Sequence, residues 1–491
     1  MFRRKSEIDF PAPQGRHEQR SGPDVPTRCR CEGGLSTGHE FPEDYSRLLS
    51  SYDEEIAQLS ARKRDALSDI RDDQGLQYVD IVLEGGGVHG IALLGYLYAL
   101  ECLGVRFRAI GGTSAGAVTT LLVACAAAPD QERIGRIMPI FEKMPLREFW
   151  DASHPVRVTV SCALGCYKTL RDAAAVPAIA GVPDWAVRRR AWASLVFFVA
   201  SLVYGVVPSI RQLWRNQGLF RGQRFERWLS DALKTLGVHS TAQMLELSRR
   251  LPESTHVFSD NGDRVRYQPD EQSDPVIVVA TDLTLGTKVH FPRHASLYIQ
   301  DVASADPAWY ARASMSIPFF FEPIRRVFQN GDAARQAHRN ATGQETKEGF
   351  DSLATRRSVL VDGGIMSNFP IDIFHMHGRV PRCPTFGAKL TEPGPPTEVH
   401  GLLAQAIRIF DVARGARDEY FISSNPDFTK LVTTIDTKNV NWLDFELTAD
   451  ARRDLFFGGF EAAIRFVRDF DWQAYKELRR TLLSTPHSAS G

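Results

Sequence analysis

Gly111-Gly112-Thr113-Ser114-Ala115-Gly116 is the stretch that decides how this 491-residue sequence is interpreted. It contains the pattern G-x-S-x-G at Gly112, Ser114 and Gly116. An apolar run over 107–110 precedes it, and small and aliphatic residues over 117–128 follow it. Strand, tight turn and buried helix in this order are typical of a nucleophile elbow, whose glycines permit the sharp turn that exposes the serine hydroxyl. Alone, the pattern is equally typical of a glycine-rich turn before a helix.

A second glycine-rich stretch lies one predicted strand earlier. An apolar run over 78–83 predicts a buried strand, and Glu84 and Gly85-Gly86-Gly87-Val88-His89-Gly90 separate it from a predicted helix over 91–103. Backbone N–H groups of such a loop bind an anion, either a nucleotide phosphate or the oxyanion of an acyl-transfer intermediate. A dinucleotide site needs an acid at the end of the next strand. That strand ends in the serine motif instead, which favours the oxyanion.

A short β-branched run, Val359-Leu360-Val361, predicts a further strand, which ends at Asp362-Gly363-Gly364. Open α/β sheets carry functional side chains at the carboxyl ends of their strands. Found alone, these residues would indicate only an Asp-Gly turn. The other elements predicted downstream are a central strand over 275–280, a hairpin partner over 286–291, a short helix over 309–315, a helix from Ile371 and a strand over 384–390.

These three blocks, taken in order, resemble the patatin-like phospholipase family, as do Ala313-Ser314-Met315-Ser316-Ile317-Pro318 and Asn368-Phe369-Pro370. The resemblance covers about 78–391. It implies a three-layer α/β/α fold with a mostly parallel central sheet. It also implies a catalytic dyad without histidine, in which Ser114 is the nucleophile and Asp362 its partner. The oxyanion hole would be formed by Gly85, Gly86 and Gly87.

The resemblance assigns supporting positions to His89, Gly90, Gly112, Gly116, Gly363 and Gly364. His89 departs from the family pattern, which usually has Arg or Lys before the last glycine of the loop. The implied activity is that of a serine lipid acyl hydrolase, of the phospholipase A type or a related lipase or esterase. It would proceed through an acyl-enzyme and would need neither a metal nor a cofactor. The alternatives are a membrane- or lipid-binding scaffold with a weak or inactive site, and nucleotide binding by the 85–90 loop.

The segment 185–228 has an unusual composition. It carries eight arginines, one acid (Glu226) and four of the eight tryptophans around an uncharged run over 191–210. Arginine flanks, edge tryptophans and an apolar centre are typical of membrane contact, and we expect a lipid or membrane surface as a partner here. A cap or interfacial helix, a core helix and a bilayer span are the alternatives. A single span is disfavoured because it would separate Ser114 from a partner beyond residue 300.

Composition excludes several other classes of function. Lys+Arg and Asp+Glu both number 59, so no overall positive field favours nucleic acid as a partner. The seven cysteines have no zinc spacing, and their scatter favours a reducing compartment. No apolar core of a Sec signal peptide follows Met1-Phe2-Arg3-Arg4-Lys5. We therefore expect a cytoplasmic protein with peripheral membrane association.

The predicted organisation has four parts. Residues 1–40 are polar and are expected to be disordered. A charged amphipathic helix is predicted over 42–73, within a unit of 41–75; its apolar stripe would pack on the domain surface, or 43–73 would bind a partner or a second copy. The catalytic domain is predicted over 76–395, with an insertion or cap at 145–272 and a loop at 329–357. Helices are predicted over 396–491.

Overall fold

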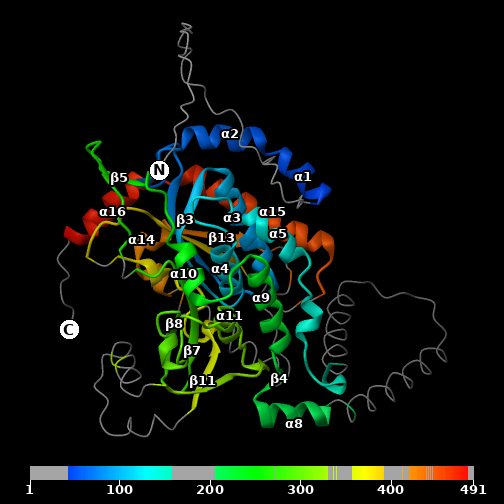
Figure 1. The fold of residues 1–491 in the computed structure, drawn as a ribbon. Helices are drawn as coiled ribbons and strands as arrows, with labels where there is room; N and C mark the ends of the chain where they lie inside the picture. The colour runs from blue at the N-terminus through cyan, green and yellow to red at the C-terminus, as the bar shows by residue number, and fades with distance from the viewer. Residues whose placement is uncertain are drawn as a thin grey trace, which may run out of the picture.

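A central sheet organises the computed structural model, which describes residues 42–157, 206–270, 273–329, 357–376, 378–391, 420–437 and 446–484, with isolated residues between them. Its core consists of five parallel strands (Figure 1). In spatial order they are β13 (Val432–Asp436), β12 (Thr385–Thr391), β2 (Gln77–Leu83), β3 (Val105–Thr113) and β7 (Val276–Asp282). The parallel core confirms the predicted α/β class.

Antiparallel strands extend this core on both sides. Beyond β7 lies β8 (Thr287–Phe291). On the other edge of β7, where β3 ends, β11 (Arg357–Asp362) pairs with the last residues of β7, and β10 (Ile324–Val327) pairs with β11. At the start of β2 lie β1 (Ile70–Arg71), β5 (His256–Phe258) and β6 (Arg264–Arg266). The predicted hairpin partner over 286–291 is confirmed as β8. The position of β11 matters most, because it brings Asp362 to the end of β3.

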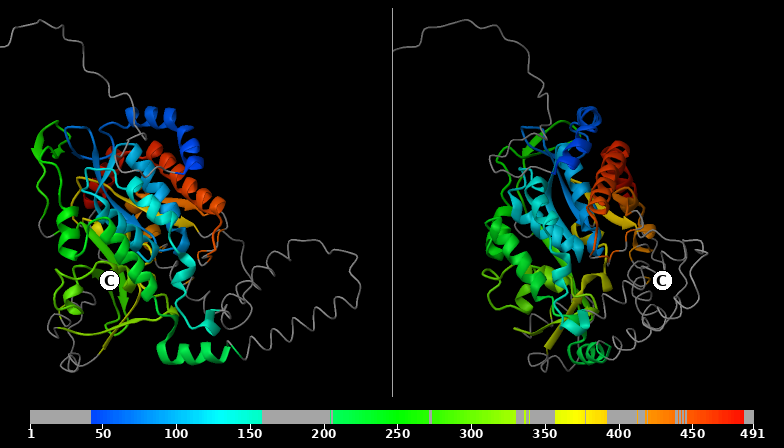
Figure 2. Two further views of the ribbon diagram at one scale, coloured as in Figure 1. Left: turned by 45° about the vertical axis from the view of Figure 1, so that its right-hand side comes forward. Right: turned by 90° about the vertical axis from the view of Figure 1, so that its right-hand side faces the viewer.

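Helices cover the sheet on two faces. The first face carries α3 (Gly90–Cys102), α4 (Ala115–Ala126), α5 (Ile134–Glu142), α9 (Gln223–Thr235), α10 (Thr241–Ser248), α11 (Ala308–Ser314) and α15 (Ala449–Asp469). In Figure 2, α9, α4, α3 and α15 follow one another across this face. On the second face, η7 (Ile371–Phe374) lies against β2 and β12, and α14 (Pro426–Thr429) contacts α16 (Trp472–Ser484). The layers are those of the predicted α/β/α fold.

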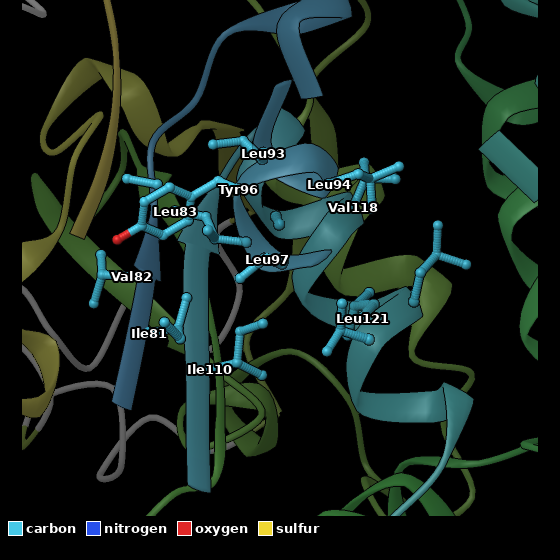
Figure 3. Packing of buried hydrophobic residues seen from close by; sticks show 14 of the residues in the cluster. Ile81, Val82, Leu83, Leu93, Leu94, Tyr96, Leu97, Ile110, Val118 and Leu121 are labelled. Carbon is cyan, nitrogen blue, oxygen red and sulfur yellow. The ribbon is translucent and has the colours of Figure 1, made fainter. Parts of the chain in front are cut away.

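The core lies between the parallel strands and the first helical layer. Figure 3 shows buried side chains of β2 and β3, such as Leu83 and Ile110, packed against Leu97 of α3 and Leu121 of α4. Full burial of a side chain of this size contributes about 1.5–3 kcal/mol to stability. Every residue of α3 is buried, because the sheet lies on one side of the helix and α15 on the other.

The N-terminal helix prediction is corrected. Two helices, α1 (Glu43–Ser50) and α2 (Asp53–Arg62), replace the single helix predicted over 42–73, and the chain then enters β1. At the break, the hydroxyls of Ser50 and Ser51 donate to the carbonyls of Arg47 and Leu48, and such bonds compete with helical pairing.

The apolar stripe of these two helices is occupied within the chain. Tyr45 packs edge-on against Phe456 of α15, and Tyr52 packs similarly against Phe460. The hydroxyl of Tyr52 donates to Glu461 at 2.7 Å. The stripe therefore packs on the domain surface, which was the first of the two predicted alternatives.

Two further predictions are corrected in the C-terminal half. The region predicted as helical over 396–491 contributes the strand β13, whose β-branched residues Val432, Thr433, Thr434 and Ile435 suit a half-buried edge position. The helix predicted from Ile371 is only the 3-10 turn η7, because the chain becomes extended at His375. The helical prediction is confirmed for α15 and α16.

The predicted insertion at 145–272 is partly integrated into the domain. Helix α9 packs against α4 and α11, and β5 and β6 join the sheet. The helix α8 (Val207–Asn216) lies at the rim next to β4 (Gly218–Phe220), as Figure 1 shows. The predicted disordered segment 1–40, residues 158–203 with most of the uncharged run over 191–210, and most of the 329–357 loop lie outside the described residues.

Candidate active site

Two strands bring Ser114 and Asp362 to the same place. Strand β3 runs parallel to β7 and ends with Thr113 opposite Val279. Strand β11 runs antiparallel to β7 and ends with Asp362 opposite Ala280, the next residue of β7. The two strands therefore approach the same stretch of β7 from opposite directions, and their carboxyl ends meet there. A methyl group built on Gly363 would lie 2.9 Å from Cγ2 of Thr113, which shows how closely these ends approach.

The backbone of Ser114 has the strained conformation of a nucleophile elbow. Its φ of 52° and ψ of −118° are rare for a residue with a side chain, and they turn the chain from β3 directly into α4. Neighbouring backbone segments crowd this turn. A methyl group on Gly112 would lie 2.7 Å from the carbonyl oxygen of Leu83, and one on Gly116 would overlap the same carbonyl. Only glycine fits these two positions of the motif.

Both side chains of the proposed dyad are buried, each with an exposed fraction of 3%. The Ser114 Oγ lies 3.2 Å from the Sδ of Met315, the residue that follows α11. The Asp362 carboxylate accepts a hydrogen bond of 2.7 Å from the N–H of Gly364 within its own turn. The Asp362 N–H donates to the Ser316 carbonyl at 2.9 Å. The residues around Met315 thus cover the serine and hold the aspartate.

Asn368 fixes the glycine-rich loop beside the serine. The Gly85 N–H donates to the Asn368 carbonyl at 3.0 Å, and the Asn368 Nδ2 donates back to the Gly85 carbonyl at 3.0 Å. The Asn368 Nδ2 also donates to the buried carboxylate of Glu84 at 3.0 Å, and this carboxylate accepts the Leu390 N–H as well. A methyl group on Gly85 would lie 3.0 Å from the Cβ of Ser114, so the loop lies directly against Ser114.

The amides of the loop differ in availability. The Gly85 N–H is engaged by Asn368, whereas among the described residues no acceptor is found for the N–H of Gly86 or Gly87. Gly87 has a φ of 55°, which favours glycine, and a methyl group there would overlap the Trp442 carbonyl. Within the described part of the chain, Gly86 and Gly87 are therefore the loop residues whose N–H groups have no acceptor.

His89 is buried beneath the C-terminal part of the chain. Its Nε2 lies 2.8 Å from the Val440 carbonyl and donates to it when that nitrogen carries the proton. The Val88 N–H beside it donates to the Trp442 carbonyl at 3.0 Å. His89 and Val88 thus help to anchor the loop to Val440 and Trp442. The motif-supporting residue Gly90 begins α3 directly after the loop.

Burial shifts the pKa of two groups near the site. Burial raises the pKa of Asp418 to about 6, although its carboxylate accepts the Phe369 N–H at 2.8 Å, next to Asn368. Burial, with a smaller contribution from the charge of Lys288, lowers the pKa of His290 on β8 to about 3. His290 is therefore neutral at physiological pH.

Sequence reasoning missed the roles of Ser314, Ser316 and Glu84. The motif 313–318 was identified, but the hydroxyl of Ser314 contacts an amide 200 positions away, which no local pattern reveals. Glu84 had a weaker signal, as a lone acid directly after a buried strand.

Among the described residues, no group of three or more His, Cys, Asp or Glu side chains has the arrangement of a metal site. Within the same residues, no helix has both the length and the hydropathy to cross a bilayer.

Comparison with known sequences decides the family. The sequence model described as patatin-like phospholipase matches residues 81–375, more than half of the chain, and the match includes Ser114, Asp362 and the glycine-rich loop. The chain belongs to the patatin-like phospholipase family. Membership in this family supports a lipid hydrolase as the class of activity. The uncharacterized protein YqhO of Bacillus subtilis (strain 168) is 23% identical over 395 residues, 80% of this chain and 100% of YqhO.

Two solved structures show a distant likeness to this patatin-like chain. The crystal structure of VipD from Legionella pneumophila matches 82% of this chain and 70% of VipD, at 15% identity and a TM-score of 0.35. The heterodimeric ExoU–SpcU complex from the type III secretion system of Pseudomonas aeruginosa matches 80% of this chain, at 14% identity and a TM-score of 0.31. This chain spans about half of that second protein, 51%. Scores this low carry no functional argument.

Proposed function

We propose that this patatin-like protein is a serine hydrolase of lipid acyl esters that works through a dyad of Ser114 and Asp362. The observation that supports the proposal is the meeting of β3 and β11 opposite adjacent residues of β7, with the strained serine directly after one strand and the buried aspartate at the end of the other. The family supports the substrate class. The serine conformation supports nucleophilic chemistry, because such strain is typical of active sites.

In the proposed reaction, the Asp362 carboxylate accepts the proton of Ser114 as Oγ attacks the ester carbonyl. The tetrahedral oxyanion is stabilised by the N–H groups of Gly86 and Gly87, while Gly85, engaged by Asn368, keeps the loop in place. The alcohol leaves with the proton, and water then hydrolyses the acyl-enzyme with Asp362 as the base. Loss of one oxyanion donor typically costs about 3–4 kcal/mol of transition-state stabilisation.

The activity test uses phospholipid vesicles and release of fatty acid. We expect the wild type to release fatty acid, and Ser114→Ala and Asp362→Asn to release none above the rate without enzyme. Asp372→Asn is the matched control, because Asp372 is a half-exposed acid on η7 that pairs with Lys288 outside the proposed dyad. Fatty acid release by folded Ser114→Ala at the wild-type rate would refute the proposal.

We also propose that α8 contacts the lipid surface. No residue of α8 is buried, and Val207, Ile210 and Trp214 recur at helical spacing, with Trp214 exposed to 83%. Arg211 and Arg215 lie on the same helix, and exposed apolar and cationic side chains together fit an anionic bilayer surface.

The connections of α8 support a role close to the proposed site. Strand β4 follows α8 directly and pairs with β9 (Phe319–Phe321), in which Phe319 is exposed to 62%. Phe319 lies four residues after Met315, which covers the nucleophile. A lipid surface that contacts α8 and Phe319 would therefore lie close to Met315, which covers Ser114.

Vesicle flotation tests this contact. Trp214→Ala should reduce binding to vesicles that contain anionic phospholipid, while hydrolysis of a soluble short-chain ester should stay unchanged. Tyr420→Ala is the control, because Tyr420 is also a highly exposed aromatic residue, at 75%, but belongs to a different part of the chain. Equal flotation of the two variants would show that α8 is an ordinary surface helix that does not contact the vesicles.

A further inference from the structure

We infer that Ser314 is a positioning residue of the active site, whose hydroxyl holds the backbone of Ser114 in its reactive conformation. The inference rests on the proposed Ser114–Asp362 chemistry and adds a third residue to it. Ser314 is the last residue of α11 and is completely buried. It touches the nucleophile through the backbone alone, so it would act through Ser114 and not on the substrate.

The direction of the two hydrogen bonds of Ser314 is fixed. Its Oγ lies 2.6 Å from the Val279 carbonyl, which can only accept, so the single hydroxyl proton points to Val279. The Ser114 N–H lies 2.8 Å from the same Oγ and donates to its lone pairs. Val279 is the residue of β7 that lies opposite Thr113. The hydroxyl thus connects the central strand to the first residue of the elbow.

Ser114 has a particular need for this bond. It lies between the last residue of β3 and the first residue of α4, and its N–H is bonded in neither element. A residue with a φ of 52° keeps such a conformation only where its surroundings determine it. The Ser314 hydroxyl is the acceptor that the structure provides for this amide.

The neighbouring residues show that the end of α11 serves both halves of the dyad. The Ser316 carbonyl accepts the Asp362 N–H at 2.9 Å, and Met315 lies over the Ser114 Oγ. The buried Arg312 donates to the Ser316 Oγ at 2.6 Å and to the Glu322 carbonyl at 2.7 Å. Arg312 thus holds Ser316 in place, and residues 314–316 contact both Ser114 and Asp362.

A matched control separates positioning from ordinary stability. Ser68 makes the same two bonds elsewhere: its Oγ donates to the Tyr78 carbonyl at 2.6 Å and accepts the Ile70 N–H at 3.1 Å. It is almost completely buried, as Ser314 is, but it lies beside β1 at the far end of β2. Ser314→Ala and Ser68→Ala remove equivalent bonds, and only the first touches the elbow.

The experiment measures kcat and KM for a soluble short-chain ester, the rate at which a fluorophosphonate labels Ser114, and the midpoint of urea unfolding. We expect Ser314→Ala to lower kcat and the labelling rate on the order of 10- to 100-fold, with KM changed less than about threefold. Ser68→Ala should shift the unfolding midpoint similarly but keep wild-type kcat. Ser314→Cys replaces the hydroxyl with a thiol of similar size that accepts hydrogen bonds only weakly, and it should lose nearly as much activity as Ser314→Ala.

Two outcomes would overturn the inference: wild-type labelling of folded Ser314→Ala or Ser314→Cys, or an equal loss of kcat in Ser68→Ala. Failure of the proposed function gives a different result, because wild-type protein would then carry no label at Ser114. If Ser314→Ala does not fold, Ser314→Cys alone decides the question against Ser68→Ala.

Discussion

Adding a single methyl group to α15 at Gly459 should destabilise the protein, because α3 and α15 pack unusually closely there. Helices α3 and α15 cross through reciprocal glycines. A methyl group on Gly459 would lie 1.8 Å from the Ala92 carbonyl oxygen, and one on Gly95 would lie 1.8 Å from the Phe456 carbonyl oxygen. The atoms that would be struck belong to helix backbones and cannot rotate away. Gly459→Ala therefore forces the two helices apart.

The expected magnitude follows from this geometry. An ordinary contact begins near 3.4 Å, so the backbones must separate by roughly 1.5 Å at the crossing. A gap of about 1 Å already removes up to half of the dispersion attraction between facing atoms. Overpacking typically costs about 1–3 kcal/mol, and occasionally more, while alanine in place of glycine in a helix returns about 1 kcal/mol. Because the overlap is with rigid backbone, the upper end of the overpacking range applies, and we expect Gly459→Ala to lower the free energy of unfolding by about 2 kcal/mol.

The neighbouring glycine is the control for this prediction. A methyl group on Gly458 would meet only the Asp436 carbonyl, at 3.0 Å, so Gly458→Ala should stay within about 1 kcal/mol of the wild type. The assay is urea unfolding followed by circular dichroism, with the midpoints of the three proteins compared. Equal midpoints for Gly458→Ala and Gly459→Ala would refute the reasoning about the crossing.

Two other predictions concern the site and its surroundings. Met315→Ala should speed fluorophosphonate labelling of Ser114 several-fold, because Met315 Sδ lies over the nucleophile; an unchanged rate would mean that another group controls access. Burial lowers the pKa of His290 to about 3 in the folded state, below its unfolded value of about 6.5. Its contribution to the free energy of unfolding is therefore complete above about pH 6.5. This contribution is lost as the pH falls toward 3, by up to about 1.4 kcal/mol per pH unit. His290→Gln should therefore gain about 2 kcal/mol relative to the wild type between pH 7 and pH 4.5, measured by urea unfolding at each pH, and parallel pH profiles of the two proteins would contradict this.

Much of the fold could be predicted from the sequence because its elements have strong local signals. Glycine blocks follow apolar runs at β2 and β3, and the acid at the end of β11 stands before two glycines. These features predicted the α/β class and the residues of the candidate site. Strand β13 was missed because it is short and lies between helical segments, so its β-branched residues gave too weak a signal.

Contacts between distant parts of the chain could not be predicted in the same way. The break between α1 and α2 depends on the hydroxyls of Ser50 and Ser51, which bond to nearby carbonyls. Serines also occur within continuous helices, so their presence in the sequence does not predict a break. The Nζ of Lys63, the residue after α2, donates to the Phe470 carbonyl at the end of α15, 407 positions later. The bond between Ser314 and Ser114 is of the same kind. A sequence pattern indicates which residues are unusual, and the fold determines what they contact.

The proposed dyad is tested most directly by fluorophosphonate labelling in the presence of anionic phospholipid vesicles, with the labelled peptide identified by mass spectrometry. The proposal predicts a single label on Ser114 in the wild type and in Asp372→Asn, none in Ser114→Ala, and strongly reduced labelling in Asp362→Asn. A wild-type protein that folds, binds vesicles and carries no label would contradict the dyad and favour a lipid-binding scaffold. Labelling of Ser114→Ala at the wild-type rate would show that the nucleophile lies elsewhere.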